Sequence, residues 1–335
     1  MGAVIARHAD DEWIPVEDAS APGRVRREAM QQAARLGFSE HRAGEVGIAA
    51  TELATNLHRH AKRGLMLVRV CRETEEGGLL MVAVDSGPGM KDFAHIARDG
   101  ESSKGTLGIG LGAVMRLASW YDVHSSLEHG SVIAAGFWDG RAPAFRPAAA
   151  GFTRAMTGET ACGDAWASHV QDGRVTVLLA DGLGHGELAA AASREAVRTF
   201  LSGTLETDLT LTLQRLNAAL RSTRGAAAAI VSADRAGETL TFAGIGNVAV
   251  WIDDGERRHA LASTPGIVGA NTKKIRALQV PLAPHARVVM HSDGLTSKWN
   301  LAAYPGLRVR DAHLIAATLL RDAGTHHDDA SIVVI

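Results

Sequence analysis

The pattern of apolar residues changes across GRAPAFRPAAAG, residues 140–151, and this change constrains the fold more than any other feature. The segment holds two prolines and several small residues, which is typical of a connection between domains. Since 335 residues exceed the roughly 100–200 of a single domain, two domains are expected. The stretches before and after the connection predict two different architectures, which together make an α+β protein.

The part before the connection is expected to place a layer of helices on an antiparallel or mixed sheet, because its strands are joined by short turns. It opens with a strand that reaches about Val16. Apolar residues at i, i+3 and i+4 predict helices, and apolar runs between turn residues predict strands. The helices are expected over 24–36, 40–62 and 110–119, and the strands over 65–72, 79–84 and, as a hairpin, 122–138.

The part after the connection contains mostly short strands separated by turn residues, with two or three helices between them. This pattern predicts a sandwich of two sheets with helices packed outside. The strands are expected over 165–170, 174–180, 226–233, 239–245, 247–252, 287–292 and 331–335, and the helices near 186–202, 208–222 and 311–321.

The composition limits the classes of protein to which the chain can belong. Hydrophobic residues make up 46% and charged residues 21%, which indicates a globular chain. Lys and Arg number 35 against 37 Asp and Glu, and this balance argues against a nucleic-acid partner. The two cysteines, Cys71 and Cys162, do not make a disulfide framework and fit a reducing compartment. The sequence shows no secretory leader and no run of about 18 apolar residues, so a soluble, cytoplasmic protein without membrane contact is expected.

Three polar residues lie four apart on the second expected helix: Glu52, Asn56 and His60. Each step of four residues turns the helix by about 40°, so the side chains form one slanting stripe beside the apolar face. Polar groups beside a core are costly unless they find partners. Taken alone, the stripe is more typical of a solvated helix face than of a site, and a structural role is the default for His60.

Two glycine-rich loops follow this stripe along the chain. Asp85 ends an expected strand and is followed by Ser-Gly-Pro-Gly, whose glycines let the backbone turn sharply beside a ligand. Residues 105–112, GTLGIGLG, lead into a helix, and the backbone N–H groups at a helix N-terminus suit phosphate. The second run imitates a dinucleotide-binding fingerprint, but the strand which that fingerprint requires does not directly precede it.

Taken in order, TELATNLHRHA, DSGPGM and DGESSKGTLGIGLGAVMRLA resemble the N, G1 and G2 boxes of the GHKL (histidine kinase-like) ATPase superfamily. That superfamily has the Bergerat ATP-binding α/β sandwich. Within it, residues 1–138 are most similar to the small serine kinases of bacterial partner-switching systems, the RsbT and RsbW type.

The resemblance assigns roles to residues of the three boxes. It implies that Asp85 binds the adenine amino group, that Asn56 holds the magnesium ion bridging the phosphates, and that Glu52 accepts the proton of the substrate hydroxyl. A lid over the phosphates is implied around Lys104. The implied ATP-binding residues are Asn56, Asp85, Gly87, Gly89, Lys104, Gly105, Thr106, Gly108, Gly110 and Gly112.

Four acids stand out after the connection. Asp181 and Asp293 each follow an apolar strand, whereas Asp164 and Asp328 come just before strands. Each one alone is typical of a turn or a helix cap. Acids at neighbouring strand ends can converge, and convergent carboxylates repel one another and usually require a cation. Such oxygen ligands favour magnesium or manganese over zinc.

The motifs G-D, A-D-G-x-G-H-G, S-D-G and D-D-A-S, in this order, resemble the metal-dependent serine/threonine phosphatases of the protein phosphatase 2C (PPM) group. They are most similar to its small bacterial SpoIIE and RsbX branch. The resemblance covers residues 151–335, with 139–150 as a linker, and implies a PPM-type β-sandwich flanked by helices.

The same resemblance implies a site for two divalent metals, Mg or Mn. Asp181 would bridge the two ions, with the Gly182 carbonyl as a further ligand. Asp293 and Asp328 would complete one ion, and Asp164 would hold the other through water.

The neighbours of these acids carry further expectations. Asp329 is expected to cap or brace the final strand. His185, His326 and His327 lie near the acids in the sequence. One of them protonates the leaving serine oxygen, or they are solvated histidines beside a charged site; both interpretations stay open.

Both resemblances together imply a bifunctional regulator, with a serine/threonine kinase domain and a serine/threonine phosphatase domain of opposite activity on one chain. In the resembled systems the phosphorylated partner is a small STAS-domain (anti-anti-sigma type) protein, and a sigma factor or a second regulator completes the switch. Two alternatives stay open: the first domain binds ATP and partner as a regulatory module without transferring phosphate, or it sequesters a sigma factor. Kinases of this type often pair, so a homodimer is compatible with the resemblance.

Overall fold

The computed structural model describes residues 4–8, 11–71, 77–90, 107–140, 142, 148–203, 208–270 and 275–335. The chain forms two compact units. The unit that we call the sandwich unit consists of Met1–Asp11, Pro147–Ala302 and Leu319–Ile335. The unit that we call the single-sheet unit consists of Glu12–Arg146 and Ala303–Thr318. Three residues of the expected phosphate lid, Lys104, Gly105 and Thr106, lie outside the described residues.

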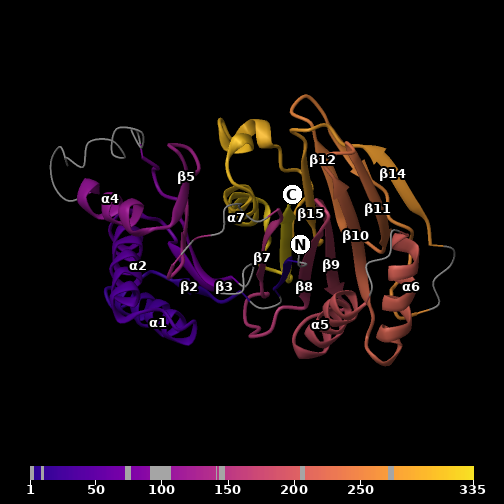
Figure 1. Ribbon diagram of the computed structural model, residues 1–335, viewed down its shortest axis with the longest axis horizontal. Helices are drawn as coiled ribbons and strands as arrows, with labels where there is room; N and C mark the ends of the chain where they lie inside the picture. The colour runs from indigo at the N-terminus through magenta and orange to yellow at the C-terminus, as the bar shows by residue number, and fades with distance from the viewer. Residues whose placement is uncertain are drawn as a thin grey trace. The chain divides into compact units, whose positions relative to one another are not determined.

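The single-sheet unit is built on one antiparallel sheet with the strand order β2-β3-β4-β6-β5. Its strands are β2 (Trp13–Pro15), β3 (Leu65–Cys71), β4 (Gly78–Val84), β5 (Trp120–Ser126) and β6 (Gly130–Phe137). The helices α1 (Ala21–Arg35), α2 (Glu40–His60) and α4 (Leu107–Leu117) cover one face of this sheet (Figure 1). A helical layer on an antiparallel or mixed sheet was expected from the short turns. The structure confirms this layer and shows that the described strands pair antiparallel.

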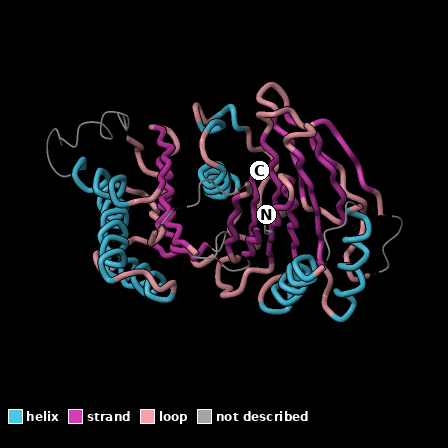
Figure 2. Tube along the Cα trace, viewed as in Figure 1, coloured by secondary structure: helices cyan, strands magenta, loops and turns pink. Residues whose placement is uncertain are grey.

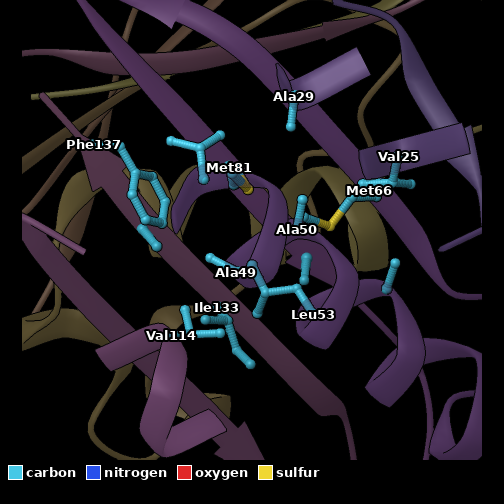
Figure 3. Close-up of a cluster of buried hydrophobic side chains, with 14 of the residues drawn as sticks. Val25, Ala29, Ala49, Ala50, Leu53, Met66, Met81, Val114, Ile133 and Phe137 are labelled. Atoms are coloured by element: carbon cyan, nitrogen blue, oxygen red, sulfur yellow. The ribbon is translucent and has the colours of Figure 1, made fainter. Parts of the chain in front are cut away.

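The core of this unit lies between α2 and the sheet. The helix α2 begins at a cap, because the side chain of Ser39 accepts a hydrogen bond from the Arg42 backbone N–H at 3.3 Å. Its small apolar residues then face the sheet, where they pack on larger side chains such as Phe137 (Figure 3). Alanines at the contact let the helix approach the sheet closely, which agrees with the scarcity of aromatic residues in the sequence, 4%.

The sandwich unit consists of two stacked sheets (Figure 2). The six-stranded sheet has the order β1-β8-β9-β10-β11-β14 and the five-stranded sheet the order β13-β12-β15-β16-β7. The strands of the first sheet are β1 (Val4–His8), β8 (Asp164–Gln171), β9 (Arg174–Gly182), β10 (Ala226–Asp234), β11 (Thr239–Ile245) and β14 (Ala277–Pro281). Those of the second are β7 (Ala150–Arg154), β12 (Ala249–Asp253), β13 (Arg258–Leu261), β15 (Arg287–His291) and β16 (Ala330–Val334).

Two apolar layers stabilise the sandwich unit. One fills the space between the sheets and contains Trp166, Phe242 and Met290. The other joins the six-stranded sheet to α5 (Glu187–Ser202) and α6 (Leu209–Ala219), which therefore lie outside the sandwich as expected. The remaining helices are α7 (Ala312–Ala323) and the 3-10 turns η1 (Leu220–Ser222), η2 (Leu301–Ala303) and η3 (Leu307–Val309). No helix of the described residues is long and apolar enough to cross a membrane.

The structure differs from the expected organisation at the start of the chain. In place of one strand reaching Val16 it has two, because β1 pairs with β8 whereas β2 pairs with β3. Asp11 marks the change of sheet: its backbone N–H donates to Thr153 Oγ1 at 3.1 Å, and its carboxylate accepts from the Thr153 N–H at 2.8 Å. The first strand of the chain thus belongs to the sandwich unit, although residues 1–138 were expected to form the first domain.

A second difference concerns residues 303–318, which belong to the single-sheet unit although they lie far along the chain. Asp122 on β5 accepts hydrogen bonds from Arg310 Nη1 at 3.2 Å and from the Asp311 N–H at 2.8 Å. The ring of His313 lies 5.6 Å from that of Trp120. The edge strand β5 is thus covered by a segment from the other end of the sequence, a pairing which local pattern cannot predict.

Candidate active sites

A cavity of about 400 Å³ opens beside the C-terminal half of α2 in the single-sheet unit. Its lining combines apolar side chains with a few polar groups, as is usual for a small-molecule site. The residues that line it are Leu53, Asn56, Leu57, Arg59, His60, Ala61, Ala83, Asp85, Pro88, Gly89, Met90, Leu111, Ser131 and Ile133. The structure therefore brings Asn56, Asp85 and Gly89 together, as the sequence motifs predicted. It adds Arg59, which stands in the first of the three boxes but had been assigned no role.

Asp85 is held at the end of β4 by backbone contacts. Its N–H donates to the Ser131 carbonyl at 2.9 Å, and its Oδ1 accepts from the Gly87 N–H at 2.6 Å. Gly89 has a φ of +63°, and a Cβ there would overlap the Ser126 carbonyl oxygen. Only glycine allows this turn to fold tightly against the β5–β6 hairpin, so the loop fixes the Asp85 carboxylate at the cavity.

Glu52 lies one helical turn before Asn56 and faces the start of α4. A Cβ on Gly110 would overlap Glu52 Oε2, so the carboxylate rests directly on this glycine. Gly112 differs, since a Cβ there would meet only Arg116 Nη1, at 3.3 Å. Of these two glycines, Gly110 leaves space for Glu52, whereas Gly112 lies away from the acid. Gly108 lies in the first turn of α4.

The second constellation is in the sandwich unit, where acids from both sheets meet. Asp164 and Asp181 are direct partners in the antiparallel pair β8–β9. Asp293 follows β15, and Asp328 precedes β16, which pairs with β15. A cavity of about 310 Å³ is lined by Asp181, Asp293 and Asp328, whereas Asp164 is buried behind them at 1% exposure. All four expected acids are therefore brought to one end of the sandwich.

Burial and mutual repulsion disfavour the charged forms of these acids. Burial, with repulsion from Asp164, Asp293 and Asp328, raises the pKa of Asp181 to about 9. Burial also raises the pKa of Asp164 to about 7, against hydrogen bonding by Ser292 and Ser331. The pKa of Asp293 is raised by burial and by Asp328. Without a cation, these carboxyl groups therefore hold their protons to a higher pH than ordinary acids do.

The donor set fits a hard divalent cation. The oxygens Asp164 Oδ2 and Asp329 Oδ2 are buried without a hydrogen-bond partner among the described residues. Carboxylates and the Gly182 carbonyl are the oxygen ligands that magnesium and manganese prefer. Within the described ranges, no group of three His, Cys, Asp or Glu side chains is arranged to hold one ion alone. Magnesium usually keeps several waters and takes one or two carboxylates.

Residues outside the expected set complete this site. The side-chain amide of Asn247, in the β11–β12 turn, donates to Asp293 Oδ2 at 2.6 Å. His185 Nδ1 pairs with Glu159 Oε1 at 2.7 Å. Neither Asn247 nor Glu159 stood in a motif, so no sequence signal pointed to them. Asp329 Oδ1 accepts from the Met156 N–H at 2.8 Å and so joins the final strand to the segment after β7, the bracing role expected for it.

Comparison with known proteins identifies a relative for each of the two domains. The family model of the histidine kinase-like ATPase domain matches residues 14–135, and that of stage II sporulation protein E (SpoIIE) matches residues 171–335. The serine/threonine-protein kinase RsbT of Bacillus subtilis is 33% identical over 106 residues, which are 32% of this chain and 80% of RsbT. The phosphoserine phosphatase RsbX of the same organism is 26% identical over 140 residues, which are 41% of this chain and 69% of RsbX.

Solved structures support the fold. A structure from work on the bacterial stressosome as a modular system adapted to control secondary messenger signalling has a TM-score of 0.52 and 30% identity, covering 56% of this chain and 97% of that one. A crystal structure of RsbX in complex with magnesium has a TM-score of 0.50 and 20% identity, covering 56% of this chain and 92% of RsbX, and shows the likeness of fold. The chain therefore belongs to the histidine kinase-like ATPase family of RsbT, with a SpoIIE-type PPM phosphatase domain fused to it.

Proposed function

We propose that the chain is a bifunctional regulator of partner switching in bacterial signalling. Its kinase-like domain would transfer phosphate from ATP to a serine or threonine of a STAS-domain protein. Its PPM-type domain would remove phosphate from a phosphoserine or phosphothreonine protein. The observation that carries the proposal is that a single chain has two cavities, each lined by residues of one motif set. Asn56, Asp85 and Gly89 line the first, and Asp181, Asp293 and Asp328 line the second.

In the phosphatase site, Asp181, the Gly182 carbonyl, Asp293 and Asp328 would hold the divalent metals, and Asp164 would act from behind them. When bound, the metals would supply an activated water and neutralise charge on the phosphate. The Asn247 amide keeps Asp293 turned toward the cavity. The main task of the protein is to hold these carboxylates rigidly on the ends of strands from both sheets.

His185 supports a second task, donation of a proton to the leaving serine oxygen. It lines the cavity, and Glu159 pairs with its Nδ1, so its Nε2 is the nitrogen left to face a substrate. His327 also lines the cavity, but no contact orients its ring in the described residues. The oriented histidine is therefore the better candidate for the general acid.

In the kinase-like site, the apolar cavity between α2, β4 and β6 would take the adenine ring. The Gly87 N–H donates to Oδ1 of Asp85 and so orients this carboxylate at the cavity, where it would bind the adenine amino group. Asn56 would hold the magnesium ion at the phosphates, and Glu52 would accept the proton of the attacking hydroxyl. Phosphoryl transfer depends mainly on positioning and charge neutralisation, so this short set is sufficient.

The kinase assignment is tested with Glu52→Gln in protein that also carries Asp293→Ala, so that removal of phosphate cannot hide its addition. We expect ATP binding to persist and phosphorylation of a STAS-domain protein to be lost. Glu40→Gln, an exposed acid in the first turn of the same helix, is the control and should phosphorylate normally. Undiminished phosphorylation by Glu52→Gln would refute the role of this acid. If ATP binds to the Asp293→Ala protein without any transfer, the domain is a regulatory module instead.

The phosphatase assignment is tested by hydrolysis of 4-nitrophenyl phosphate with magnesium or manganese. Asp293→Asn removes one proposed ligand and should abolish metal-dependent turnover. Glu256→Gln changes an exposed acid in the β12–β13 turn and should leave turnover intact. Metal-dependent turnover by Asp293→Asn at the wild-type rate would show that the metal site lies elsewhere.

A further inference from the structure

The lining of the phosphatase cavity is acidic, whereas the phosphate group of the proposed substrate is negatively charged. Its described lining contains the carboxylates of Asp181, Asp293 and Asp328 and the imidazoles of His185 and His327, but no lysine or arginine. A phosphoserine carries a charge of about −1.5 to −2 at neutral pH. A phosphoprotein approaching this acidic mouth therefore gains from a permanent cation at the rim, in addition to any metal inside.

Arg224 is the residue placed to meet this need. A Cβ added to Gly184, which lines the cavity, would lie 3.1 Å from Arg224 Nη1. The guanidinium thus lies over the Asp-Gly-Leu-Gly turn that carries Asp181. Gly184 has a φ of +87°, so its glycine permits both the turn and the approach of the arginine.

The backbone around Arg224 is fixed to the same turn. The Leu183 N–H donates to the Gly225 carbonyl at 3.0 Å, which joins the two segments directly. The hydroxyl of Thr223 donates to the Leu220 carbonyl at 2.7 Å and accepts from the Gly225 N–H at 3.0 Å. Arg224 is therefore carried by a short, internally bonded turn, and its Cα is held beside the cavity.

The guanidinium of Arg224 is also available. It is exposed, and within the described part of the chain it makes no hydrogen bond or ion pair. Arg154, on β7 and two residues before Met156 of the cavity lining, donates instead to the carbonyls of Leu320 and Thr325 at 3.3 and 2.7 Å. An uncommitted arginine beside a carboxylate-lined cavity serves no stabilising contact, which points to a ligand.

We propose that Arg224 binds the phosphate of the phosphoprotein substrate at the rim of the phosphatase cavity. The inference rests on the proposed phosphatase function. The planar guanidinium fork can donate two parallel hydrogen bonds to two oxygens of the phosphate. Exposed Leu183 and Ile267, which flank the Arg224 turn, offer apolar surface to the residues beside the phosphoserine.

The assignment is tested with Arg224→Ala, Arg224→Lys and the control Arg221→Ala, an exposed arginine three residues earlier. Hydrolysis of 4-nitrophenyl phosphate with manganese gives KM and kcat, and calorimetry gives the affinity for inorganic phosphate. A charge-assisted bidentate contact corresponds to about a tenfold change, so Arg224→Ala should raise KM and the phosphate Kd about tenfold. The kcat should change less than about threefold, since the arginine binds the ground state and the transition state alike.

The other variants define the contact further. Arg224→Lys keeps the charge but loses the fork, so its KM should fall between those of the wild type and Arg224→Ala. Arg221→Ala should match the wild type. If Arg224→Ala has the KM and phosphate Kd of Arg221→Ala while the wild type is active, the inference fails and the phosphatase assignment stands. If the wild-type chain hydrolyses nothing with either metal, both fail together.

Discussion

Gly110→Ala should separate stability from catalysis in the kinase-like domain. In a helix interior alanine is favoured over glycine by about 1 kcal/mol. The new Cβ, however, would overlap Glu52 Oε2 and lie 3.2 Å from Glu52 Cδ. Because that carboxylate ends a flexible side chain, it can turn away at a torsional cost of about 0.5–1.5 kcal/mol. The two effects nearly cancel, so the free energy of unfolding should stay within about 1 kcal/mol of the wild type.

Catalysis should respond differently, because a displaced base cannot reach the attacking hydroxyl. A misplacement of about 1 Å typically costs about 100-fold in rate. The assay is phosphoryl transfer from ATP to a STAS-domain protein in the Asp293→Ala background, followed by intact mass, beside nucleotide affinity and a denaturation curve. Gly112→Ala is the matched control, since its Cβ would meet only the end of Arg116. Equal transfer rates in Gly110→Ala and Gly112→Ala would refute the idea that the contact with Gly110 positions the Glu52 carboxylate for catalysis.

Three further outcomes follow from the packing and the charges. With a chelator present to remove metal, the thermal midpoint of unfolding should fall as the pH rises from about 4 towards 9. The folded-state pKa values of Asp164, about 7, and Asp181, about 9, lie above the unfolded value of 3.8. Over this pH range the folded state must therefore lose protons that the unfolded state has already released, which destabilises the fold. Manganese should flatten this dependence, and a midpoint independent of pH without metal would contradict the repulsion among the acids. Gly294→Ala should lower the free energy of unfolding, measured by urea denaturation, by about 2 kcal/mol or more, because the new Cβ would overlap the Asp329 carbonyl oxygen. An unchanged free energy of unfolding would mean that the backbone segments at Gly294 and Asp329 can separate without cost. Asp122→Ala should cost about 1–3 kcal/mol, because the Asp311 N–H and Arg310 lose their acceptor, while hydrolysis of 4-nitrophenyl phosphate should persist if the loss stays local.

The sequence predicted most elements because their signals are local. The periodicity of α2 predicts a helix, and the apolar runs of β9 and β10 predict strands. The observed elements begin and end within a few residues of the expected bounds. The four acids could also be identified from the sequence, because each stands at or beside the end of an expected strand. The sequence shows only where these acids stand along the chain. The structure shows that they meet, because Asp164 pairs with Asp181 across two neighbouring strands.

The remainder depends on contacts between distant segments. The strand β7 begins at Ala150, in a run of alanines and prolines typical of a linker, and it forms because β16 pairs with it. The strand β1 joins β8, over 150 residues away along the chain, and 303–318 covers β5. The contacts of Asn247 with Asp293 and of Glu159 with His185 depend on side-chain geometry between segments far apart in the chain. Pattern reasoning has no access to such partners, because neither spacing nor composition identifies them.

The central claim is that one chain carries both activities for one partner, and a single mass measurement tests it. Asp293→Ala protein is incubated with ATP, magnesium and a STAS-domain protein, whose intact mass is recorded before and after addition of wild-type chain with manganese in the absence of ATP. The account predicts a gain of one phosphate in the first step and its loss in the second. No gain despite measurable ATP binding, or a phosphate that the wild-type chain cannot remove, would contradict it.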